Sequence, residues 1–306
     1  MVQFRRLDPL ANAGPFQRLQ KMPVKSFSLT EAQYNRVVEK RPQLLVTEGE
    51  AAVIGVPTLD TLEIHYAFPD AERFHDRFGE LFNQIVAASS VAEAPRGVVL
   101  PFRDRPNRSS ANTVFWGLLM EEGREWVEMS RVAIPEMDEP GESIGEGFRV
   151  REATEADRDA IAGIEAEATG KPRLSDTALT YLLEDNRWLR IVEDGNGTRA
   201  GFLALRPEPG GWGVIQLVAV RPDHAEALRQ PLLDWTTAFL RNNGGRRIRQ
   251  VVHLDEAPTL SLLRAAGFTA GETGIDYTRT VDQTELKAQL DERKAHGTVV
   301  KFGWWR

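Results

Sequence analysis

The sequence of 306 residues contains no cysteine. That absence excludes disulfide bonds, a thiolate nucleophile and cysteine-ligated zinc. Long apolar runs are missing too, because the most hydrophobic stretch, residues 214–220, is far too short to span a bilayer. The first residues show no apolar segment of the kind that a secretory signal needs. We therefore expect a cytoplasmic protein without a membrane partner.

An excess of positive charge is missing as well. The formal net charge is −7 at pH 7, and the five histidines are scattered without the spacing of metal ligands. A negative field repels phosphate backbones and tolerates or attracts a cationic substrate. Nucleic acid is therefore not an expected partner, and no metal site is predicted. At about 150 residues per domain, the length predicts about two domains.

An internal repeat divides the chain. Residues 134–147 are rich in proline, glycine and acidic side chains, which indicates a linker. On either side the chain restarts in the same way, with a short amphipathic strand that opens at Phe4 and again at Phe148 and leads into a helical stretch. We predict a first domain at residues 1–133, the linker at 134–147 and a second domain at 148–282. A C-terminal helix with a tail follows at residues 283–306.

The second half shows the order of elements clearly. Thr154 to Asp157 resembles a capping box with aspartate in place of glutamate, which predicts a helix start. The predicted order of elements in this half is strand, helix, three strands, helix, strand, helix and strand. The first half repeats this order with longer connections. The predicted fold is α/β, with two tandem domains that each consist of a mostly antiparallel mixed sheet flanked by helices.

Three segments of the second half resemble the GNAT superfamily of N-acetyltransferases: residues 148–157 (FRVREATEAD), 217–222 (LVAVRP) and 262–268 (LLRAAGF). In that family, backbone N–H groups at a helix N-terminus receive the pyrophosphate of CoA, and small residues allow close approach. The resemblance implies acetyl-CoA, or another acyl-CoA, as co-substrate. It places this co-substrate on Leu217, Val218, Val220, His224, Ala225, Glu226, Ala227, Leu228, Arg229 and Gln230.

The loop before the second helix departs from the family's pattern. Ala227 replaces the first glycine, and Arg229 stands where a second small residue is expected. The Arg229 side chain either obstructs the path of the pantetheine arm or pairs with a phosphate. Glu226 adds negative charge beside the expected anion.

The first half resembles the same family more faintly. Arg73 matches the first position of the loop, but Asp76 and Phe78 replace the small residues, so bulk and charge block the cradle. We interpret the first half as a degenerate copy without a cofactor site, an arrangement similar to other tandem members of the superfamily.

Catalytic candidates are few. Leu263 occupies the place of the tyrosine that often protonates the leaving thiolate in this family, and the central strand offers no carboxylate. His253 ends the next strand and titrates near neutrality when unperturbed. Glu63 shares one strand face with His65 in the first half, and Tyr277 lies on the last strand. A structural or solvated role remains the alternative for His253 and for Glu63.

The resemblance implies transfer of an acyl group from acetyl-CoA, or a related acyl-CoA, to a small-molecule amine. Two alternatives from other classes remain open: a non-catalytic binding or assembly module that keeps the GNAT fold, and an acyl-CoA sensor. Trp304 and Trp305 directly precede the last residue, Arg306. They dock either on the chain's own body or on a second copy, which leaves a homodimer open.

Overall fold

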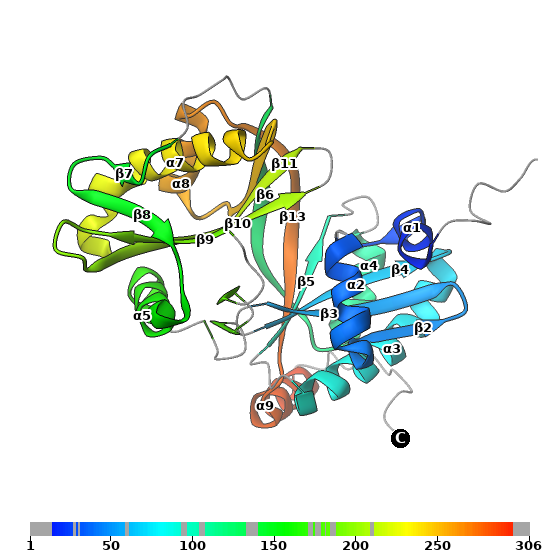
Figure 1. Cartoon of the computed structure of the whole chain (residues 1–306). Coiled ribbons are helices and arrows are strands. Elements are labelled where there is room, and N and C mark those ends of the chain that lie inside the picture. Colours follow the sequence, from blue (N-terminus) through cyan, green and yellow to red (C-terminus); the bar gives the residue numbers. More distant parts are fainter. Residues whose placement is uncertain are drawn as a thin grey trace, which may run out of the picture. The chain divides into compact units, whose positions relative to one another are not determined.

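The computed structural model forms two compact units. Unit 1 comprises Met1–Gly123 and Ile275–Arg306, and unit 2 comprises Arg124–Gly274. Figure 1 labels their elements. The structure describes residues 14–26, 29, 31–58, 61–92, 97–103, 108–132, 140–170, 174, 179–180, 182–183, 188–208 and 211–295. The tryptophan pair Trp304 and Trp305 lies outside these residues.

Unit 1 contains a mixed sheet in the order β2-β3-β4-β5-β13, with β1 paired to β4. All neighbours are antiparallel except β4 and β5. The strands are β1 (Val24–Lys25), β2 (Leu45–Glu48), β3 (Ala51–Thr58), β4 (Thr61–Phe68), β5 (Gly97–Phe102) and β13 (Thr269–Thr280). The helices are α1 (Pro15–Gln20), α2 (Glu31–Lys40), η1 (Pro42–Leu44), α3 (Ala71–Ala92), α4 (Arg108–Gly117) and α9 (Gln283–Ala295).

Aromatic side chains fill the core of unit 1. Tyr66 of β4 lies 5.0 Å from Phe74 and 5.2 Å from Phe78 of α3, measured between ring centroids. Phe115 of α4 lies 4.8 Å from Tyr277 of β13. All five side chains are buried. Tilted and edge-on rings of this kind add to the free energy gained by apolar burial, and they leave little free volume between β4, α3 and α4.

Unit 2 contains the sheet order β6-β12-β11-β10-β9-β8-β7. All neighbours are antiparallel except β11 and β12. The strands are β6 (Glu121–Val132), β7 (Ser143–Ile144), β8 (Phe148–Glu152), β9 (Trp188–Glu193), β10 (Arg199–Glu208), β11 (Trp212–Val220) and β12 (Arg247–His253). The helices are η2 (Glu155–Asp157), α5 (Arg158–Thr169), η3 (Pro222–His224), α7 (Ala225–Asn242) and α8 (Ala257–Ala265). The predicted fold class is confirmed: the fold is α/β, and the mixed sheet within each unit is mostly antiparallel.

The last strand of each repeat belongs to the other unit. Residues 126–132 of β6 follow the elements of unit 1 in the chain but pair with β12 of unit 2. Residues 275–280 of β13 follow the elements of unit 2 but pair with β5 of unit 1. The units therefore differ from the predicted ranges 1–133 and 148–282 by an exchange of C-terminal strands. Part of the predicted linker, Ser143–Ile144, also pairs with β8 and extends the sheet of unit 2.

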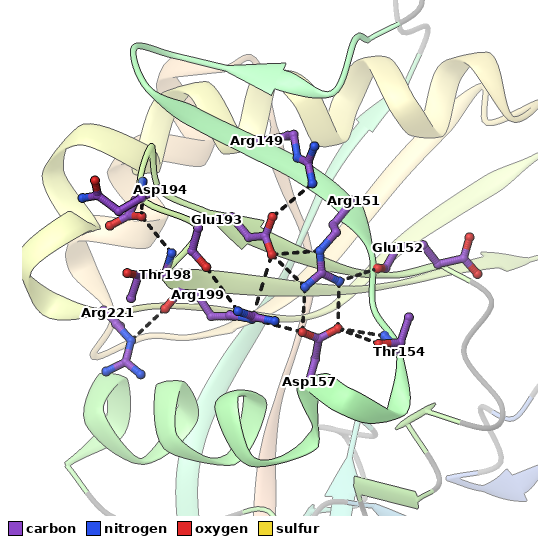
Figure 2. A network of polar contacts seen from close by, with 12 residues as sticks. Arg149, Arg151, Glu152, Thr154, Asp157, Glu193, Asp194, Thr198, Arg199 and Arg221 are labelled. Atoms are coloured by element: carbon purple, nitrogen blue, oxygen red, sulfur yellow. Dashed lines mark hydrogen bonds and ion pairs between the residues drawn. The ribbon is translucent and has the colours of Figure 1, made fainter.

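An ionic network joins β8, β9 and β10 of unit 2 (Figure 2). The Asp157 carboxylate is fully buried and accepts two hydrogen bonds from Arg151, at 2.7 and 2.8 Å, and one from Arg199 at 3.2 Å. The same carboxylate accepts from the backbone N–H of Thr154 at 2.9 Å, so the predicted capping box is confirmed. Arg151 also donates to Glu193 of β9 at 2.9 Å. The network fixes β8, β9 and β10 to the start of α5.

Candidate functional site

Strands β11 and β12 diverge inside unit 2. Their parallel ladder covers only three residue pairs, Trp212–Val214 with Arg247–Arg249. On its other side β11 stays paired with β10 as far as Val220. Residues 215–220 therefore leave β12 while remaining part of the sheet. Backbone groups on the β12 side of this stretch are therefore not part of the ladder with that strand.

A bulge in β11 accompanies the divergence. Ala204 of β10 pairs with Leu217 and Leu205 pairs with Ile215, so Gln216 is an extra residue on β11. A bulge of this type bends the strand and increases its twist. The Gln216 side chain is exposed. The bulge gives a physical reason why β11 turns away from β12 directly after Val214.

A cavity of about 380 Å³ opens beside the diverging part of β11. Apolar side chains of β11, α7 and α8 form most of its wall, and Gln250, Glu256, Thr236, Thr259 and Arg229 supply polar groups. A mostly apolar cavity with a few polar groups is the usual form of a small-molecule site. Among the ten residues predicted to hold a cofactor, four line the cavity: Val218, Val220, Ala225 and Arg229.

The other six residues of that prediction lie near the cavity but do not line it. Leu228 is fully buried in the core of unit 2. Gln230 is exposed and donates to Asp234 at 2.8 Å. The remaining four are Leu217, His224, Glu226 and Ala227. The helical period explains the split within 228–230, because consecutive positions on α7 point about 100° apart and only some of them face β11.

The start of α7 presents a cation at the cavity. No side chain caps the first turn of this helix, which begins at Ala225. Arg229, one turn further on, is exposed and has no hydrogen-bond or ion-pair partner among the described residues. A guanidinium beside the N-terminus of a helix suits a phosphate group. Exposed Glu226 brings opposite charge to the same turn. Arg229 therefore places a positive charge on the cavity wall beside the first turn of α7.

One carboxylate lies on the described wall of this cavity. Glu256 directly precedes α8, and its carboxylate accepts a hydrogen bond from Arg124 at 3.0 Å. Arg124 also donates to Asp255 at 3.0 Å and thereby lowers the pKa of that carboxyl group. Sequence reasoning did not select Glu256. The available signal was its place, because it lies between the end of β12 and the start of the helix that carries Leu262 and Leu263.

The three predicted catalytic residues lie in different places. His253 ends β12 in register with Trp126 of β6, is half-buried, and does not line the cavity. In unit 1, Glu63 Oε1 lies 3.0 Å from His65 Nε2, so the two side chains do share a strand face. Tyr277 is buried in the aromatic core of unit 1, with its hydroxyl against Asn112 and Glu122. A catalytic role for each stays a prediction.

Unit 1 has the same strand arrangement, with aromatic side chains packed beside it. Its parallel ladder also covers three pairs, Thr61–Glu63 with Gly97–Val99. However, β3 and β4 keep a regular register with no bulge. Beside β4, the side chains Tyr66, Phe74, Phe78 and Phe115 are all buried and pack against one another. The predicted block at Phe78 is therefore part of an aromatic core that extends beyond the loop.

In the part of the chain that the structure describes, no three His, Asp or Glu side chains are grouped so that they could hold a metal ion. None of the described helices combines the length and the apolar character that crossing a membrane requires.

Comparison with known proteins shows similarity in structure alone. No protein-family model matches the sequence, and no curated protein matches it. A GCN5-related N-acetyltransferase from Sphaerobacter thermophilus superimposes with a TM-score of 0.54 and 18% identity, over 75% of this chain and 76% of that one. The N-myristoyltransferase of Saccharomyces cerevisiae gives a TM-score of 0.59 at 11% identity, over 87% and 76%.

The third comparison covers both repeats. A tandem GNAT protein from the clavulanic acid biosynthesis pathway superimposes with a TM-score of 0.55 and 12% identity, over 87% of this chain and 94% of that one. The fold is therefore that of the GCN5-related N-acetyltransferases. More particularly, it is the tandem form of that fold, as the internal repeat of the sequence implied.

Proposed function

We propose that unit 2 binds an acyl-CoA and transfers its acyl group to the amino group of a small molecule. The observation that carries this proposal is the cavity where β11 and β12 diverge, with strand backbone outside their ladder on one side and Arg229 at the start of α7 on the other. Strand backbone outside a ladder suits the amide groups of a pantetheine arm, and the cation suits the phosphates.

The residues of the cavity fit an acyl-CoA in kind and in place. Residues 215–220 would accompany the pantetheine arm, while Ala225 and Arg229 would face the pyrophosphate. A bound acyl-CoA supplies an activated thioester. Backbone N–H groups of β11 that face the cavity would stabilise negative charge on the reacting carbonyl oxygen.

Glu256 is the proposed proton acceptor. In the transfer, the amine nitrogen forms a bond to the acyl carbon, the carbon–sulfur bond breaks, and the nitrogen must lose a proton. The Glu256 carboxylate lies on the described cavity wall, and Arg124 fixes its position. Its charge also attracts a cationic acceptor, in keeping with the net charge of −7.

Filling the cavity tests the location of the site. Val218 lines the cavity and is 39% exposed, so a larger side chain there fits the strand and projects into the cavity. We expect Val218→Trp to weaken the binding of acetyl-CoA by about 30-fold, because the indole occupies the volume that the ligand needs. Calorimetric titration with acetyl-CoA and with free CoA measures the change.

Val251→Trp is the matched control. Val251 lies on neighbouring β12, is 47% exposed and does not line the cavity. This variant should bind acetyl-CoA as tightly as the unmodified chain. If both tryptophan variants bind equally well, the proposed location is wrong. Binding lost only in Val218→Trp, with no turnover on any amine of a broad panel, would favour the acyl-CoA sensor over the enzyme.

A substitution at Arg229 tests whether this side chain attracts the phosphates of CoA or obstructs the binding of CoA. Because its guanidinium has no described partner, we expect Arg229→Ala to weaken CoA binding by about tenfold at 50 mM salt, and by less at 300 mM salt, where charges are screened. Titrations at both salt concentrations give the two values. Gln230→Ala, on the same turn but off the cavity wall, should bind normally. Tighter binding in Arg229→Ala would mean that this arginine obstructs the site.

A further inference from the structure

A second cavity, of about 530 Å³, lies in unit 1 between α3 and α4. Its wall includes Gly79 and Ala87 of α3 and Val114 and Leu118 of α4, with Arg279 of β13 beside them. The volume falls in the range typical of small-molecule sites. This cavity is separate from the aromatic core, because the α3 positions that line it alternate with Phe74, Phe78 and Phe82, which point into the core.

Arg279 lacks a negatively charged partner among the described residues. Its Nη1 lies 3.5 Å from the amide oxygen of Asn83, at the limit of a hydrogen bond, and its guanidinium lies 5.5 Å from the centroid of the Phe82 ring. Its Nε is buried and makes no described hydrogen bond. Burial lowers the pKa of Arg279. A guanidinium still keeps its charge in a protein, so a partly buried one without a counterion is costly unless an anion joins it.

The remaining charges at this cavity narrow the choice of anion. Glu80 also lines it, and its carboxylate lies 3.0 Å from Arg77 Nη1. His75 is the other titratable side chain on the described wall, and Arg279 is the one guanidinium there. With the Glu80 carboxylate already paired, this set of charges suits one negative charge better than a dianion. The neighbouring wall at Ala87, Val114 and Leu118 is apolar. The cavity therefore combines a site for one anionic head group with an apolar surface for the body attached to it.

We propose that unit 1 binds a small-molecule monocarboxylate with an apolar body, of the size of a medium-chain fatty acid, with its carboxylate on Arg279 and its chain between α3 and α4. The planar guanidinium offers the paired donors that a carboxylate accepts. This site lies in the degenerate repeat, and it does not depend on acyl-CoA binding in unit 2. The degenerate copy would then have a ligand-binding role of its own.

Calorimetric titration with decanoate and with decanol tests the two parts of the site. Decanoate should bind at least about tenfold more tightly than decanol, because only decanoate pairs with Arg279. Arg279→Met keeps the length of the side chain and removes its charge, so it should bring decanoate affinity down to that of decanol. Inorganic phosphate should give no heat, because it has no apolar body. Equal affinities for decanoate and decanol in the unmodified chain would overturn the proposal.

Two further variants keep the test decisive if Arg279→Met folds poorly. A Cβ atom at Gly79 would lie 3.5 Å from Leu118 Cδ2, an ordinary contact, so Gly79→Leu should fold while its side chain fills the cavity. This variant should lose the binding of decanoate and of decanol, yet bind acetyl-CoA normally. Arg73→Met, at an exposed position of α3 off the cavity, should bind decanoate normally. Decanoate binding that survives Gly79→Leu would place the ligand elsewhere.

Discussion

Replacing Asp157 by alanine should lower the free energy of unfolding of unit 2 by about 4 kcal/mol. The carboxylate is fully buried and accepts hydrogen bonds from Arg151, Arg199 and the Thr154 backbone. Its removal takes a negatively charged partner from the guanidinium groups of Arg151 and Arg199, and it also removes the helix cap. Glu193 stays beside Arg151, which limits the loss. Asp157→Asn keeps one acceptor for the cap, so the expected loss is smaller.

Urea unfolding and hydrogen exchange measure this loss. The change should appear as earlier exchange in peptides that span residues 148–157 and 188–199, where the network lies. Asp159→Ala is the matched control. Asp159 is an exposed acid in the first turn of the helix that follows Asp157, and it should change the stability by less than about 0.5 kcal/mol. Equal effects of the two substitutions would mean that the network adds nothing beyond a surface charge.

The same network predicts how stability depends on pH. The hydrogen bonds from Arg151 hold the pKa of Asp157 well below its usual range, and they also lower the pKa of Glu193. A lowered pKa in the folded state gives stability that is present above the unfolded value, about 4, and is lost as pH falls toward the folded value. The stability difference between the unmodified chain and Asp157→Asn should therefore be full at pH 6 and shrink below about pH 4.

Local sequence signals predicted local structure well. The capping box from Thr154 to Asp157 was predicted from four adjacent residues, because it needs only neighbours in the chain. The partners of Asp157 could not be predicted in this way. Arg199 is 42 positions away in the sequence and reaches the carboxylate only after β10 has paired with β9. Alternation along a strand shows which side chains share a face, but it does not identify the neighbouring strand.

The exchange of strands β6 and β13 illustrates the same limit. Both segments have the alternation of a strand, and both were predicted to be strands. Each follows its own repeat in the chain, so the sequence alone favoured pairing within the repeat. The registers that the structure forms place Trp126 opposite His253 and Tyr277 opposite Leu100 instead.

Only part of the candidate site was predicted from the sequence, again because contacts between distant segments are not visible there. The family motif located Val218, Val220, Ala225 and Arg229, which the structure brings to one cavity. Glu256 lies just beyond His253 in the sequence but was not among the predicted catalytic residues, because only the three-dimensional structure shows that it lines the cavity. A bulge of one residue leaves no clear mark in the alternation of β11.

Glu256→Gln should lower kcat/KM for the acylation of an amine by about 100-fold while leaving the binding of acetyl-CoA unchanged. Glutamine keeps an oxygen that accepts the hydrogen bond from Arg124, so the side chain should stay in place while losing its ability to accept a proton. The assay follows release of free thiol from acetyl-CoA, with the best acceptor found in an amine panel. His253→Gln is the comparison, because His253 lies off the cavity wall.

The pH dependence of kcat/KM in the two variants shows whether Glu256 accepts a proton or has only a structural role. Without a carboxylate, Glu256→Gln can use only amine that is already unprotonated, and that fraction rises with pH. The deficit of this variant should therefore shrink steadily between about pH 7 and pH 9, whereas a misplaced side chain would cost the same factor at every pH. A 100-fold loss in His253→Gln, together with a normal Glu256→Gln, would instead make the histidine the base. In that case β12 would supply the base through its last residue, the catalytic candidate that its place at the strand end suggested.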